Sequence, residues 1–112
     1  LAEPIEGCEG SVVRFSEAGS SGEDALFYSG PNTNKIFRRN MAIMTSRDDG
    51  ASWTEVVVVD AGSVSYSSLQ VVPALAPERA GKFDLALLYE RSNTLSVVFE
   101  PDEICLWRYP LE

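Results

Sequence analysis

The chain of 112 residues contains no histidine and only two cysteines, Cys8 and Cys105, which lie near opposite ends. Without histidine, the common Ser–His and Cys–His catalytic pairs cannot form within this chain, and the cysteine spacing does not suit a metal site. We therefore expect neither a metal nor a cofactor. The cysteines are expected to be two small buried thiols, with one long-range disulfide as the alternative.

Basic residues are also scarce. The chain has 9 Lys and Arg but 17 Asp and Glu, which gives a formal charge of -8 at pH 7. This charge would repel phosphate backbones and anionic membrane surfaces, so nucleic acid is not an expected partner. No run of about 18 apolar residues is present, so no membrane span is expected. The chain opens at Leu1 without a signal-like segment, and the missing initiator Met suggests a processed or excised piece.

Short apolar or alternating runs bounded by turn residues fill the chain, and none keeps a period of 3.6 residues. This pattern predicts an all-β fold. Eight strands are expected: Ser11–Phe15, Ala25–Ser29, Met41–Thr45, Trp53–Val59, Ser65–Val72, Phe83–Tyr89, Leu95–Phe99 and Ile104–Arg108.

Four antiparallel strands followed by four more are typical of two β-propeller blades, and a small eight-stranded sandwich is the alternative. Two isolated blades would leave apolar outer faces in water, so something outside this sequence is expected to complete the fold. The completing piece is either the rest of a longer chain or two further copies in a six-blade ring.

The turn from Ser46 to Trp53 reads Ser-Arg-Asp-Asp-Gly-Ala-Ser-Trp, which follows the pattern S-x-D-x-G-x-x-W. In a tight turn between strands, Asp48 can accept hydrogen bonds from backbone N–H groups and Gly50 can adopt a positive φ. Trp53 is expected to return its ring to the sheet. This spacing resembles the Asp box of the sialidase (neuraminidase) family and of other β-propellers.

Other motifs extend the resemblance to nearly the whole chain. They are Gly-Cys-Glu-Gly-Ser-Val-Val from Gly7, Phe-Arg-Arg-Asn-Met from Phe37, Val-Ser-Tyr-Ser-Ser-Leu from Val64 and Leu-Leu-Tyr-Glu from Leu87. Their order is similar to the C-terminal third of sialidases. The resemblance implies two blades of a six-blade propeller, the penultimate over residues 1–62 with its Asp box at 46–53, and the last over 63–112.

The resemblance also implies roles for three residues. Arg39 matches the third arginine of the triad that binds the sialic acid carboxylate, and its neighbour Arg38 is the other candidate, because adjacent strand residues face opposite sides. Tyr66 matches the nucleophile, since sialidases use tyrosine where most glycosidases use a carboxylate. Glu90 matches the glutamate that orients the first triad arginine. Ser46, Asp48, Gly50 and Trp53 would be structural.

No residue of this chain matches the first two triad arginines, the acid/base aspartate or the glutamate that activates the tyrosine. The implied function is therefore a part of an exo-α-sialidase that hydrolyses terminal sialic acid with retention. A sialylated glycan would be the substrate, and the remainder of the propeller would be a necessary partner. The chain alone is expected to be inactive. The resemblance favours a secreted, lysosomal or cell-surface location without fixing it.

Two other functions fit the same residues. A non-catalytic glycan-binding or structural propeller segment would keep Arg39 and Tyr66 for binding only. An Asp-box propeller that acts on another sugar would show no preference for an anionic sugar over a neutral one.

Overall fold

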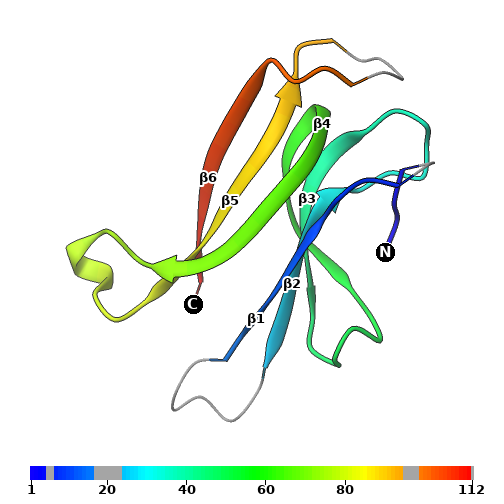
Figure 1. Cartoon of the computed structure of the whole chain (residues 1–112). Coiled ribbons are helices and arrows are strands. Elements are labelled where there is room, and N and C mark those ends of the chain that lie inside the picture. Colours follow the sequence, from blue (N-terminus) through cyan, green and yellow to red (C-terminus); the bar gives the residue numbers. More distant parts are fainter. Residues whose placement is uncertain (5–6, 17–23, 95–98, 112) are drawn as a thin grey trace.

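A computed structural model describes residues 1–4, 7–16, 24–94 and 99–111. It confirms the all-β class (Figure 1). The described part contains six strands and one short 3-10 helix: β1 Ser11–Phe15, β2 Ala25–Pro31, β3 Arg39–Ser46, β4 Thr54–Pro73, η1 Pro77–Arg79, β5 Phe83–Ser92 and β6 Glu103–Leu111. Within these residues, no helix has the length and apolar character needed to cross a membrane.

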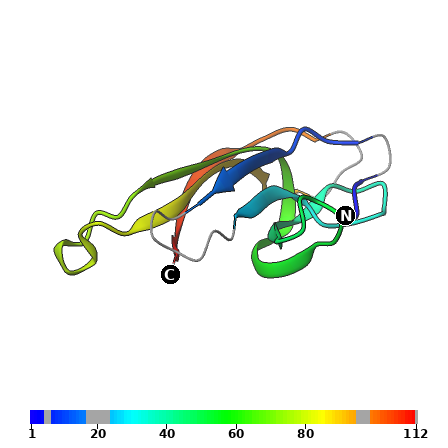
Figure 2. The ribbon, with the colours of Figure 1, turned by 90° about the horizontal axis from the view of Figure 1, so that it is seen from below.

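The strands form one antiparallel sheet in the order β1-β2-β3-β4-β5-β6, so each strand pairs with the next along the chain. Figure 2 shows that this sheet is curled rather than flat. Connections of 7 to 10 residues link successive strands. They are shorter than the dozen or more residues that a parallel crossover needs, so each strand pairs antiparallel with the next.

The strand count differs from the expected eight at two places. The expected strands Trp53–Val59 and Ser65–Val72 are joined in the single strand β4, which runs over 20 residues. No proline separates them, and the Asp60 carboxylate accepts the Gly62 N–H at 2.9 Å, so the chain bends without leaving the sheet. The expected strand Leu95–Phe99 lies outside the described residues except for Phe99, which is not in a strand.

The bend divides β4 into two limbs with different neighbours. The first limb pairs with β3 from Thr54 to Ser63, and the second pairs with β5 from Ser63 to Pro73. In Figure 1, β4 runs upward beside β3, turns at the top of the view and returns beside β5. The expected boundary between residues 62 and 63 falls at this bend. That the two parts are propeller blades stays a prediction.

The core lies between these two parts of the sheet. Phe27 and Ile43 from the first part and Leu69 and Leu87 from the second belong to one buried apolar cluster. On the second limb of β4, buried residues alternate with exposed ones, as the two-residue period of a strand requires. One strand face therefore packs inward while the other is left open.

The turn between β3 and β4 has the bonding that its residues predict. The Asp48 Oδ1 atom accepts the Ser46 hydroxyl and the Ser52 N–H, both at 2.8 Å. Gly50 has a φ of 91°, and the Trp53 indole N–H donates to its carbonyl at 3.1 Å. The Trp53 ring meets Tyr28 edge to face, so the turn is anchored on β2.

An apolar patch is exposed on the β5–β6 pair. Leu88, Ile104 and Leu106 are exposed by 48%, 74% and 64%, and Leu88 is paired with Leu106. A neighbouring pair, Glu90 and Ile104, continues the same face. Large apolar side chains grouped in this way are a feature of surfaces that another protein segment covers.

Candidate functional site

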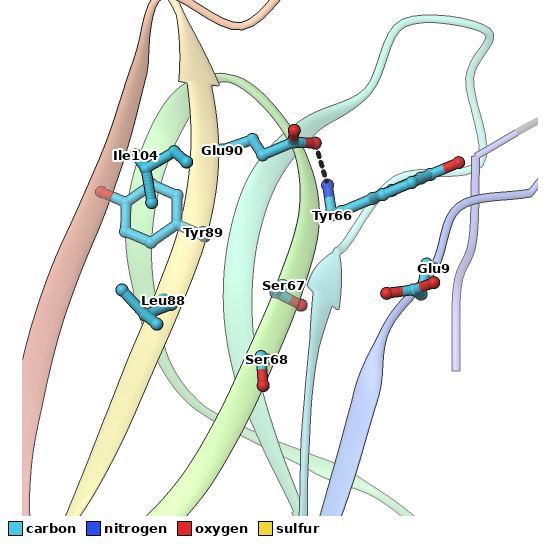
Figure 3. A pocket seen from close by; sticks show the side chains of 8 residues that line it. All are labelled: Glu9, Tyr66, Ser67, Ser68, Leu88, Tyr89, Glu90 and Ile104. Carbon is cyan, nitrogen blue, oxygen red and sulfur yellow. Dashed lines mark hydrogen bonds between the residues drawn. The ribbon is translucent and has the colours of Figure 1, made fainter.

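Tyr66 lies at a β-bulge in the second limb of β4. Val64 pairs with Arg91 and Ser67 pairs with Tyr89, so Ser65 and Tyr66 together face the single residue Glu90. A bulge of this kind breaks the ladder and re-aims a side chain, and bulges are frequent beside active sites. The Tyr66 N–H donates to the Glu90 Oε1 atom at 3.2 Å in place of a ladder bond (Figure 3). The Tyr66 side chain is 47% exposed.

Arg38 reaches the same bulge from the segment before β3. Its guanidinium donates to the Ser65 Oγ at 2.9 Å and to the Gly7 carbonyl at 3.1 Å. Its Cζ lies 5.7 Å from the centre of the Tyr66 ring, which is the range of a cation–π contact. The structure therefore brings Arg38, Tyr66 and Glu90 together.

A pocket of about 220 Å³ adjoins this group, and Tyr66, Glu90 and Glu9 are among its lining residues (Figure 3). The Tyr66 ring projects away from β5, above Glu9 in this view. Two carboxylates at the edge of the pocket make its surroundings acidic, so Arg38 is the positive group beside the phenol. Cys8 is also near, with its Sγ 3.7 Å from the Ser65 Oγ, and burial raises the pKa of its thiol.

Arg39 lies apart from this group. It is exposed, pairs with Ser63 at the start of β3 and lines a different pocket of about 280 Å³ together with Gly62 and Arg91. Within the described part of the chain its side chain makes no hydrogen bond or ion pair. Asn40, which follows it, has a φ of 62°, and register shifts between Arg39 and Met41 mark a second bulge. The resemblance assigned the carboxylate-binding role to Arg39, with Arg38 as the alternative, and in the folded chain it is Arg38 that lies beside Tyr66.

Sequence reasoning did not assign a role to Ser65, Cys8 or Glu9. Ser65 is buried and supports Arg38, while Glu9 lies at the pocket. The run Gly7–Gly10 was a motif without an assigned role, and the separation of 57 residues between Cys8 and Ser65 leaves no local signal for their contact. Both thiols, Cys8 and Cys105, are free and half-buried.

The arrangement places a guanidinium, which can bind an anionic group, beside a phenol, which can attack a carbon. A guanidinium presents a planar set of donors that suits a carboxylate, and it keeps its charge at any working pH. A phenol can act as a covalent nucleophile when a base takes its proton. The Glu90 Oε1 atom accepts the Tyr66 N–H, and this bond holds the backbone that carries the phenol.

No protein-family model matches the chain. Sialidase-2 of Rattus norvegicus is 32% identical to it over 105 residues, which are 88% of this chain and 26% of that protein. Sialidase-2 of Cricetulus griseus is 30% identical over 104 residues, again 88% of this chain and 26% of the relative. The chain thus spans about a quarter of the length of these curated relatives. Over most of its own length, it is similar to part of a sialidase.

Proposed function

We propose that this chain supplies part of the active site of an exo-α-sialidase, with Tyr66 as nucleophile, Glu90 as a positioning residue and Arg38 as the carboxylate-binding arginine. The observation that carries the proposal is the grouping of these three residues at one bulge of β4. The similarity to Sialidase-2 over 88% of the chain supports the same function.

The chemistry of sialic acid explains why an arginine and a tyrosine should be neighbours. The carboxylate of this sugar is attached to the anomeric carbon, so the group that holds it must lie beside the group that attacks. An anionic nucleophile would be repelled by that carboxylate, whereas a neutral phenol would not. Arg38, at 5.7 Å from the Tyr66 ring, meets this requirement better than Arg39, which lines another pocket.

In the proposed reaction, the Tyr66 oxygen forms a bond to the anomeric carbon while the glycosidic bond breaks. A base takes the phenolic proton, and an acid protonates the departing oxygen. Water then attacks the same carbon and releases both the sugar, with retained configuration, and the tyrosine. The acid/base aspartate, the activating glutamate and two further arginines would come from outside this chain. The exposed apolar patch formed by Leu88, Ile104 and Leu106 supports a covering by further blades.

The test is release of a fluorescent aglycone from an aryl α-sialoside by the complete protein and by its Tyr66→Phe variant. We expect loss of one hydroxyl to lower kcat by roughly 10³-fold or more, because no covalent intermediate can form. Tyr109→Phe is the matched control, since it removes a hydroxyl on β6 without touching the site, and it should retain full activity. Equal activity of the Tyr66→Phe variant and the unaltered protein would rule out the assigned nucleophile.

The arginine assignment has its own comparison. Loss of charge-assisted hydrogen bonds to a carboxylate costs about 1.5–3 kcal/mol, or roughly 10-fold to 100-fold in kcat/KM. We expect this loss for Arg38→Gln and not for Arg39→Gln. The reverse order would return the role to Arg39. A protein that binds sialic acid through Arg38 but shows no turnover would instead be the non-catalytic glycan-binding segment.

A further inference from the structure

A second pocket, lined by two arginines, lies where β4 bends between its two neighbouring strands. Ser63 at the bend is opposite Arg39 on β3 and opposite Ser92 on β5, so the two neighbours diverge from one residue. Ala61 and Gly62 together face the single residue Asn40, and this bulge leaves a pocket of about 280 Å³. This volume suits a small ion or a single sugar rather than a larger ligand.

Two observations indicate what the pocket takes. Arg39 lines it, is exposed, and has no hydrogen bond or ion pair among the described residues, so its donors are available. Ser63 is only 6% exposed, and its Oγ is buried without a hydrogen-bond partner in the part of the chain that the structure describes. A buried hydroxyl without a hydrogen-bond partner costs about 1–3 kcal/mol in desolvation, so a polar ligand that bonded to it would offset this cost.

Arg91 supplies the opposite side of the pocket and is held in place. Its Nε donates to the Asp60 Oδ2 at 3.0 Å, and its Nη1 donates to the Asn93 Oδ1 at 3.0 Å. Burial opposes ionisation of Asp60, but hydrogen bonds from the Gly62 N–H, Arg91 and Tyr89 outweigh it and lower the pKa of that carboxyl. Asp60 and, at 3.8 Å, Glu103 therefore balance the charge of Arg91, and Arg39 is the pocket arginine that no described carboxylate pairs with.

Gly62 keeps the pocket open beside this ion pair. A Cβ added there would come within 3.1 Å of the Asp60 Oδ1 and 3.6 Å of the Arg91 Nη2. A larger residue would thus push against the ion pair that positions Arg91.

We propose that this pocket, formed by Arg39, Gly62, Ser63, Arg91 and Asn93, binds a small oxyanion such as the carboxylate or sulfate group of an acidic sugar. The site goes beyond the proposed hydrolysis and does not depend on it. The two sites use neighbouring residues of the chain. Arg38 and Glu90 contact the Tyr66 bulge, whereas the next residues, Arg39 and Arg91, line this pocket. The net charge of -8 opposes anion binding at long range, so we expect dissociation constants on the order of millimolar.

The test is an amide NMR titration of the protein with sodium sulfate and, separately, sodium acetate, at constant ionic strength set with chloride. We expect saturable shifts of the Gly62, Ser63 and Asn93 amides with at least one of the two anions. Arg39→Gln should weaken binding by about 10-fold or more, because hydrogen bonds to a charged group are the strong ones. Ser63→Ala should weaken it by roughly 2-fold to 10-fold.

Arg47→Gln is the matched control. It removes the same charge just past the other end of β3, roughly 25 Å away for an extended strand, and should leave the binding constant unchanged. Because Arg39 is exposed and has no partner among the described residues, its variant should keep the amide spectrum of the folded protein. Absence of a saturable shift with both anions would overturn the proposal. Equal binding by Arg39→Gln and the unaltered protein would do the same.

Discussion

Two buried serine hydroxyls join the two parts of the sheet, and their removal gives a sharp test of the packing. The Ser29 Oγ on β2 lies 2.8 Å from the Ser67 Oγ on the second limb of β4. Ser29 is fully buried and Ser67 is 6% exposed. The Ser67 hydroxyl can also donate to the Ser29 carbonyl at 3.3 Å, so the two partners are not equivalent.

This asymmetry predicts unequal costs in the free energy of unfolding. Ser67→Ala strands the Ser29 hydroxyl in the core and should cost about 1–3 kcal/mol. Ser29→Ala leaves the Ser67 hydroxyl with the Ser29 carbonyl as partner, so it should cost only about 0.5–1.5 kcal/mol. In the double variant no hydroxyl is stranded, so its cost should fall below the sum of the single costs by at least about 0.5 kcal/mol.

Urea unfolding followed by tryptophan fluorescence measures all four free energies. Ser68→Ala is the control, because Ser68 is the exposed neighbour of Ser67, and its effect should stay within about 0.5 kcal/mol. Additive costs of the two substitutions would refute the contact between β2 and β4. A larger cost for Ser29→Ala than for Ser67→Ala would refute the hydrogen bond from the Ser67 hydroxyl to the Ser29 carbonyl.

The turn between β3 and β4 carries the remaining two predictions. Hydrogen bonds from Ser52 and Ser46 lower the pKa of Asp48 from 3.8 to about 2, so the stability they add is complete above pH 3.8 and is lost as the pH falls through about 2. Asp48→Asn should therefore lower Tm at pH 7, and the difference should shrink toward pH 2 in a thermal melt. Trp53→Ala should cost about 2–3 kcal/mol in urea unfolding, less than a fully buried tryptophan, because its ring is only partly buried against Tyr28. An unchanged unfolding midpoint for Trp53→Ala would mean that the turn is not anchored on β2.

The sequence was sufficient for features that depend on neighbouring residues in the chain. Alternating runs predicted the all-β class. The turn residues predicted that Asp48 accepts a backbone N–H, that Gly50 has a positive φ and that Trp53 returns its ring to the sheet. It was not sufficient for features that depend on the strands on either side. The gap expected between residues 59 and 65 is a bend within β4, because Ser63 pairs both with Arg39 on β3 and with Ser92 on β5.

The position of the arginines is the clearest case of information that only the register contains. Strand alternation says that Arg38 and Arg39 face opposite sides, but it does not say which of them meets Tyr66. Asn40 adopts a left-handed φ of 62°, which asparagine tolerates better than most residues, and the bulge beside it sets the direction of the preceding segment. Two bulges, this one and the one at Tyr66, together decide which arginine lies beside Tyr66, and no local sequence pattern specifies both of them.

The two bulges explain how one strand supports two different environments. At the first, Ala61 and Gly62 face the single residue Asn40 and open a pocket lined by Arg39 and Arg91. At the second, Tyr66 leaves the ladder and its N–H passes to the Glu90 side chain. In a regular β4, the N–H groups would all bond within the sheet and each residue would pair with one residue of a neighbouring strand. Neither the open pocket nor the exposed phenol would then form. The irregular pairing of β4 is therefore the feature on which both proposed sites depend.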